Sequence, residues 1–125
     1  MAITEGIMDC VSITNFIGTA LMSANISKKQ IQKISEKGVK EIIMIPDQDE
    51  TGLLTLQRNI NDLYYYYPPS LNLNVYIYNI PNGFKDFNEY YIKSEDGNIY
   101  TERLKKYKKN SLSVFSAPKR RKLII

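Results

Sequence analysis

A continuous apolar run in the middle of the chain, Ile42-Ile43-Met44-Ile45, limits the folds open to this sequence. Pro46 ends the run, and segments with apolar residues at helical spacing lie on both sides of it, over 28–37 and 51–65. A short, uninterrupted apolar segment of this kind is typical of a strand that is covered on both faces, as in parallel sheets. The run therefore predicts a buried strand over 41–45 and an α/β fold.

Strands and helices are expected to alternate along the chain. Ser27 is a suitable N-cap for one helix, and Pro68-Pro69 ends the next. The other expected elements are strands over 2–4, 16–22 and 73–80, and short helices over 7–14 and 87–93. This order predicts a Rossmann-like four-stranded parallel sheet with right-handed crossovers and helices on both faces. A chain of 125 residues has room for one such domain, which we place at 1–93, before an extension over 94–125 that is partly helical or disordered.

The residue types that are missing exclude several kinds of active site. The chain has no histidine, which excludes Ser-His-Asp triads, Cys-His dyads and histidine-ligated zinc. The single cysteine, Cys10, can form no internal disulfide and no thiolate cluster. Any catalysis must therefore use carboxylates, lysine, tyrosine, hydroxyl groups or a hard metal ion held by oxygen ligands.

Neither a membrane span nor a secretion signal is evident in the sequence. No apolar run approaches the length that crosses a bilayer. The N-terminal residues lack the charged, apolar and cleavage regions of a signal peptide. We therefore expect a cytoplasmic protein, in a bacterial or phage-infected cell, without a membrane partner.

Acidic residues follow three of the predicted strands: Glu5, then Asp47 and Asp49, then Asp86. Ligands of open parallel sheets bind beyond the carboxyl ends of the strands, so these side chains are expected to converge. Gathered carboxylates repel one another unless a cation lies among them, and Mg²⁺ prefers hard oxygen ligands and bridges to phosphate. The pattern predicts a Mg²⁺ site that would also accept Mn²⁺. The alternative for Asp47 and Asp49 is a solvated turn in which Asp49 caps the following helix.

The motifs around these acids resemble the Toprim domain. Glu5-Gly6 follows a short strand and Asp47–Gly52 follows an apolar strand, as in the Toprim domains of primases, topoisomerases, OLD-type nucleases and recombination-mediator proteins. The segment Glu5–Asp9 looks like the EGxxD form of primase-like members, and Lys85–Glu89 is similar to their KDxN(D/E) element. The resemblance therefore favours the primase branch, of bacterial, phage or mobile-element type.

This resemblance implies a Mg²⁺-dependent domain that contributes nucleotidyl transfer to the synthesis of RNA primers in DNA replication. Asp47 and Asp49 would hold the metal, and Glu5 would be a further ligand or the general acid/base. Asp9 and Asp86 would be outer acids of the metal site, and Lys85 would contact a phosphate. The implied partners are single-stranded DNA, nucleotides, and a replicative helicase or other primase domains. A small nuclease and a non-catalytic nucleic-acid-binding or assembly module remain as alternatives.

Basic residues are concentrated at the C-terminal end. Residues 103–125 contain 9 Lys/Arg and no acid, whereas residues 1–102 contain 8 Lys/Arg and 13 Asp/Glu. Such a tail can follow a nucleic-acid backbone through its phosphates. The residues expected to do so are Lys105, Lys106, Lys108, Lys109, Lys119, Arg120 and Arg121. A solvated tail, a nuclear localisation signal and a helix over 101–109 that leads into another domain are the alternatives.

Overall fold

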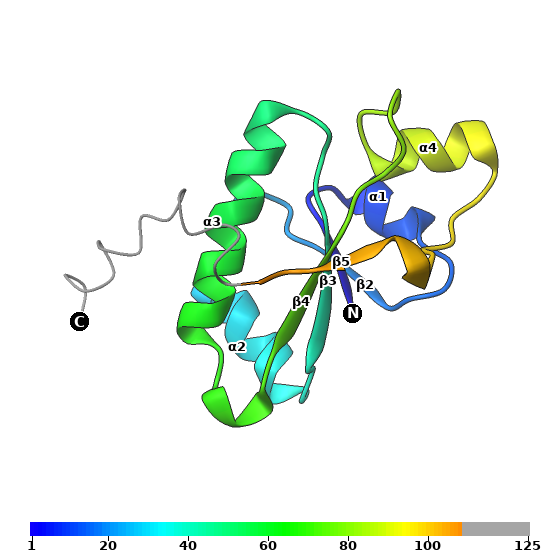
Figure 1. Cartoon of the computed structure of the whole chain (residues 1–125). Coiled ribbons are helices and arrows are strands. Elements are labelled where there is room, and N and C mark those ends of the chain that lie inside the picture. The colour runs from blue at the N-terminus through cyan, green and yellow to red at the C-terminus, as the bar shows by residue number, and fades with distance from the viewer. Residues whose placement is uncertain (109–125) are drawn as a thin grey trace.

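A five-stranded sheet forms the centre of the computed structural model, which describes residues 1–108 (Figure 1). Its strand order is β2-β1-β3-β4-β5, with β1 to β4 parallel and β5 antiparallel to β4. The strands are β1 (Ala2–Thr4), β2 (Gly18–Ala20), β3 (Glu41–Ile45), β4 (Asn74–Tyr78) and β5 (Leu104–Lys106). The four predicted parallel strands are therefore confirmed, and a fifth is added to them.

Helices cover both faces of this sheet, as predicted from the sequence. In Figure 1, α2 (Lys28–Glu36) and α3 (Glu50–Tyr66) lie on one face, and α1 (Ile7–Ser12) and α4 (Phe87–Ser94) lie on the other. Side chains of β3 alternate between two hydrophobic clusters. Ile42 and Met44 pack in the cluster that contains α2 and α3 residues, whereas Ile43 and Ile45 pack in the cluster that contains Phe87 and Tyr90 of α4. The apolar run is continuous because both of its faces are buried.

Local signals place the helix ends. Ser27 caps α2 in a capping box with Gln30, which confirms the predicted N-cap. The helix α3 ends at Tyr66, just before Pro68 and the 3-10 helix η1 (Pro69–Leu71). Within residues 1–108, no helix combines the length and the apolar character that a membrane span requires.

The segment after α4 packs against the sheet. Ile99 is 1% exposed and Tyr107 is 8% exposed, and the Tyr107 N–H donates to the Val75 carbonyl at 2.8 Å. A helix over 101–109 was one alternative for this segment, and that prediction is wrong for residues 101–108. A 3-10 helix, η2 (Thr101–Arg103), and the strand β5 form there instead, because β4 offers a free edge whose backbone groups pair with β5.

Candidate acidic site

Glu5 and Asp47 follow the two strands at which the strand order reverses. From β1 the chain crosses to β2 on one side, and β3 then returns to pair with β1 on the other side. Thr4 of β1 is in register with Ile45 of β3, so Glu5 and Asp47 lie just beyond neighbouring strand ends. Such a switch point is where open α/β sheets bind their ligands.

The carboxyl groups of Glu5 and Asp47 lie close enough to affect each other's ionisation. Burial is the largest cause that raises the pKa of Asp47, to about 7, and the neighbouring carboxyl group of Glu5 adds to it. The charges of Asp86 and Asp49 raise this pKa further. One proton between two close carboxylates relieves their repulsion in the absence of a cation.

A cavity of about 470 Å³ lies over this pair of carboxyl groups. Its acidic lining residues are Glu5, Asp9, Asp47 and Asp86. Asp9 is only 8% exposed, and burial raises its pKa, as do the charges of Asp86 and Asp47. The Asn88 N–H donates to Asp9 Oδ1 at 2.8 Å and partly offsets this effect. The structure therefore brings four of the five predicted metal-site acids to one cavity.

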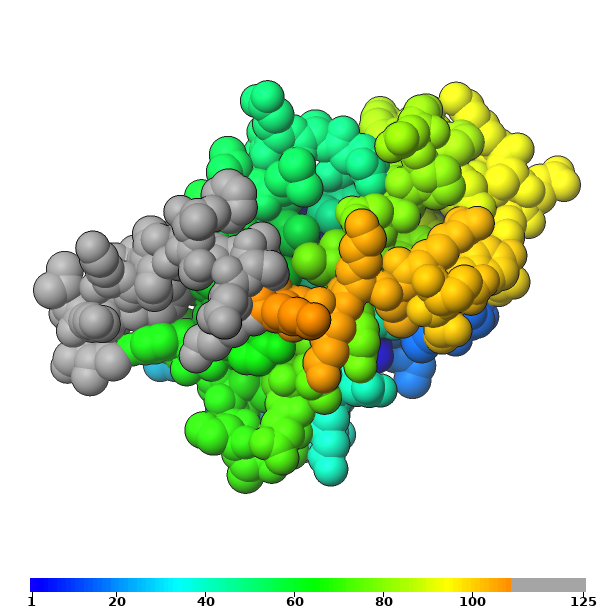
Figure 2. Space-filling model, viewed as in Figure 1, coloured from blue at the N-terminus to red at the C-terminus, as the bar shows by residue number. Residues whose placement is uncertain are grey.

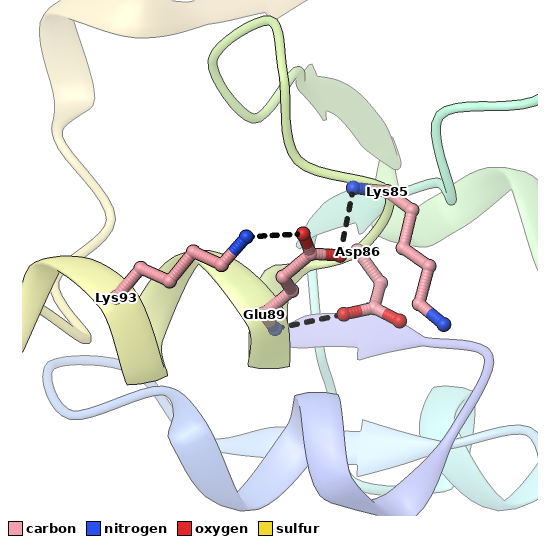
Figure 3. Close-up of polar contacts among 4 residues, drawn as sticks. All are labelled: Lys85, Asp86, Glu89 and Lys93. Carbon is pink, nitrogen blue, oxygen red and sulfur yellow. Dashed lines mark hydrogen bonds and ion pairs between the residues drawn. The ribbon is translucent and has the colours of Figure 1, made fainter.

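Two of the acids also cap helices. Asp86 Oδ1 accepts from the Glu89 N–H at 2.8 Å at the start of α4, and Glu89 in turn pairs with Lys93 at 3.0 Å (Figure 3). Asp49 Oδ1 accepts from the Gly52 N–H at 2.5 Å at the start of α3. Asp49 is exposed and is not among the residues that line the acidic cavity. It occupies the capping position that was the alternative to metal binding.

The predicted basic contacts lie in different places. Figure 3 shows the Lys85 side chain on the same side as the Asp86 carboxylate, pointing away from Lys93. Lys105 and Lys106 are exposed on β5, whose residues (orange) lie on the surface in Figure 2. Lys108 is also exposed. The remaining predicted contacts are outside the described residues: Lys109, Lys119, Arg120 and Arg121.

The donor atoms of the cavity suit a hard cation. Glu5 and Asp47 offer carboxylate oxygens, which Mg²⁺ prefers, and their mutual repulsion favours a cation between them. In residues 1–108, no group of three or more Cys, Asp or Glu side chains is arranged to hold one metal ion. Mg²⁺ usually keeps several waters and takes one or two protein carboxylates together with substrate phosphates. The Glu5–Asp47 pair therefore fits Mg²⁺ as a two-carboxylate site.

Comparison with known protein families identifies the fold. A sequence profile described as Toprim-like matches residues 2–91, which is more than half of the chain. The chain belongs to the Toprim-like family. This family assignment confirms the resemblance that the acidic motifs indicated. No curated protein matches the sequence.

A solved structure has a similar fold. The fold is similar to a crystal structure of the Aquifex aeolicus primase that comprises its zinc-binding and RNA polymerase domains, with a TM-score of 0.57 and 24% identity. The match covers 77% of this chain and 22% of the primase chain. This Toprim chain therefore spans about a fifth of the primase structure that it matches, and the likeness is one of fold.

Three residues in or beside this Toprim site were not identified as functional from the sequence. Asn88 fixes Asp9 through its N–H, and its place in the Lys85–Glu89 element was the available signal. Gln48 lies between the two aspartates and contacts the loop after β4, which only the tertiary structure reveals. Met22 lines the cavity with a left-handed φ of 64°, and no sequence pattern predicts that conformation.

Proposed function

We propose that the acidic site binds Mg²⁺, or Mn²⁺ in its place, and serves a primase-like nucleotidyl transfer that synthesises RNA primers in DNA replication. The observation that carries the proposal is that Glu5 and Asp47 line one cavity beyond neighbouring strand ends, at the switch point of a Toprim-family sheet. The partners would be nucleotides and single-stranded DNA. Because the chain spans a fifth of the primase that it matches, a replicative helicase or further primase domains are also proposed as partners.

Each acidic residue has a distinct part in this proposal. Glu5 and Asp47 would hold the metal, and Glu5 would also be suited to proton transfer at the reacting oxygen. Asp9 and Asp86 would bind metal-coordinated waters from the cavity wall. Asp49 would act on the metal only through its charge or its second oxygen, because its Oδ1 caps α3.

A bound Mg²⁺ would neutralise charge on phosphate oxygens and orient the attacking hydroxyl group. Lys85 projects on the side of Asp86 and would contact a phosphate as a point charge. The lysines of β5, Lys105 and Lys106, would contact the nucleic-acid backbone at a greater distance from the acids.

The decisive experiment is a titration with Mn²⁺, followed by electron paramagnetic resonance, of the wild type, Glu5→Gln and Asp47→Asn. Glu36→Gln is the matched control, because Glu36 is an exposed acid on α2. We expect the two site variants to lose at least about ten-fold in affinity, as is usual when metal sites are perturbed. Equal affinity of all four proteins would overturn the proposed site.

Primer synthesis and DNA cleavage are then measured with single-stranded DNA, nucleotides and Mg²⁺, for the wild type and Asp47→Asn. Primer synthesis that depends on Asp47 supports the nucleotidyl-transfer proposal. Cleavage without primer synthesis would indicate a nuclease instead of a nucleotidyl transferase. Metal binding without either activity would indicate a nucleic-acid-binding or assembly module.

A further inference from the structure

Gln48 lies between Asp47 and Asp49, yet its side chain faces a different cavity from that of Asp47. This second cavity, of about 380 Å³, is lined by Gln48, Asn82, Gly83, Phe84, Lys85 and Glu89. Asp47 and Asp86 line the acidic cavity instead. Neighbouring residues of the loops after β3 and β4 therefore line different cavities, and Gln48 lies in the one that Asp47 and Asp86 do not line.

Gln48 joins these two loops at two points. Its backbone N–H donates to the Lys85 carbonyl at 2.8 Å, a bond that any residue except proline could form. Its side-chain Nε2 donates to the Ile80 carbonyl at 3.2 Å, which requires a donor at the end of a side chain of this length. Ile80 is 3% exposed, so this second bond attaches the loop after β3 to a buried part of the chain.

The opposite side of Asp47 is held by the start of α3. A Cβ atom added to Gly52 would lie 2.3 Å from the Asp47 carbonyl oxygen, so the first turn of the helix packs directly on this backbone. Pro46, which is buried, restricts the chain before Asp47. The Asp47 backbone is thus enclosed between a helix and the contacts of Gln48.

This restraint has a consequence for the acidic pair. Two neighbouring ionised carboxylates repel each other, and an unrestrained Asp47 side chain would turn towards solvent. A backbone held on both sides limits that movement and keeps a two-carboxylate site formed before a cation arrives. We infer that Gln48 is a positioning residue that holds the Asp47 carboxyl group beside Glu5 by tying the loop after β3 to the loop after β4.

This inference rests on the proposed metal site, and its test compares Mn²⁺ affinity with stability. Gln48→Met keeps the length of the side chain without the donor, and Gln48→Asn keeps an amide that is too short to reach Ile80. Gln32→Met is the matched control, since Gln32 is an exposed glutamine on α2. Affinity and the spectrum of bound Mn²⁺ are measured by electron paramagnetic resonance, and Tm by thermal unfolding.

We expect both Gln48 variants to lose about ten-fold in Mn²⁺ affinity and to broaden the Mn²⁺ spectrum, with Tm close to that of the control. In metal-free solution, the backbone N–H at position 48 should exchange faster in both variants than in the wild type, because its bond to the Lys85 carbonyl opens more often. If both variants keep the Mn²⁺ affinity and the exchange rate of the wild type, this inference is overturned while the proposed metal site stands. If Asp47→Asn binds Mn²⁺ as well as the wild type, the proposed metal site fails, and the inference fails with it.

Discussion

Glu5 and Asp47 bring their carboxyl groups together in one cavity, although two strands, β2 and β3, and two helices separate them in the sequence. The pair exists because β1 and β3 are neighbours in register, which places both residues beyond adjacent strand ends. Burial and the neighbouring acids raise the pKa of Asp47 to about 7, so this carboxyl group keeps a proton at lower pH. A cation that replaces this proton would remove the repulsion, so the pair links metal binding to both pH and stability.

Stability should fall as the pH rises through the pKa of Asp47. The folded-state pKa of about 7 lies above the ordinary value of 3.8, so the folded protein binds this proton more tightly than the unfolded chain does. The contribution of Asp47 is therefore complete below about pH 3.8 and is lost as the pH passes about 7. Urea unfolding between pH 4 and pH 8 measures this trend against Asp47→Asn, which should show a flatter profile.

Mg²⁺ should reverse that loss. Above pH 7 the ionised pair is available to the cation, and a ligand that binds only the folded state raises its stability. Millimolar Mg²⁺ at pH 8 is expected to raise the Tm of the wild type and to leave that of Asp47→Asn nearly unchanged. Adding a chelator should return the wild type to its Tm without Mg²⁺. Equal shifts in both proteins would contradict the two-carboxylate site.

The two glycines of the acidic motifs should respond differently to alanine. At Gly52 a Cβ would overlap the Asp47 carbonyl oxygen at 2.3 Å, so Gly52→Ala is expected to cost roughly 1–3 kcal/mol of unfolding free energy. At Gly6 the nearest atom to a Cβ is Asp9 Oδ2 at an ordinary 3.5 Å, and the cost should stay below about 1 kcal/mol. Chemical denaturation measures both values, and equal costs would refute the close approach at Gly52.

Asp9 should matter for stability through its hydrogen bond more than through its charge. Asp9→Ala leaves the Asn88 N–H without its acceptor in a part-buried position, at an expected cost of about 1–3 kcal/mol. Asp9→Asn keeps an oxygen there and removes a buried charge, so it should cost clearly less. The two variants are compared by urea unfolding. Similar losses would mean that the negative charge itself stabilises the contact between α1 and α4.

The strand β5 should contribute to the stability of the whole sheet. Tyr107 is 8% exposed and its ring centroid lies 5.4 Å from that of Tyr64 on α3. Tyr107→Ala is expected to lower the unfolding free energy by about 3 kcal/mol. Lys106→Ala, at the exposed last residue of β5, should change it by less than about 0.5 kcal/mol. If both substitutions lower the unfolding free energy by equal, small amounts, β5 is detached from the sheet in solution.

Local patterns were sufficient to predict most of the elements. The apolar run 42–45 predicted the central strand because both faces of a central parallel strand are buried. Ser27 and Pro68-Pro69 predicted helix ends because capping and the missing proline N–H act over a few residues. The helix over 101–109, one alternative for the basic end, is wrong for residues 101–108, since the pairing of 104–106 with β4 depends on an edge that forms far away in the sequence.

The sequence by itself determined which acids follow which strands, because that order is set by local alternation of strands and helices. Only the tertiary structure decided how these acids divide their tasks. Asp49 caps α3 outside the cavity, Asp9 is enclosed by α4, and Gln48 bridges two loops. Such contacts join residues from elements far apart in the chain, and their geometry depends on side-chain direction and register, which no local pattern encodes.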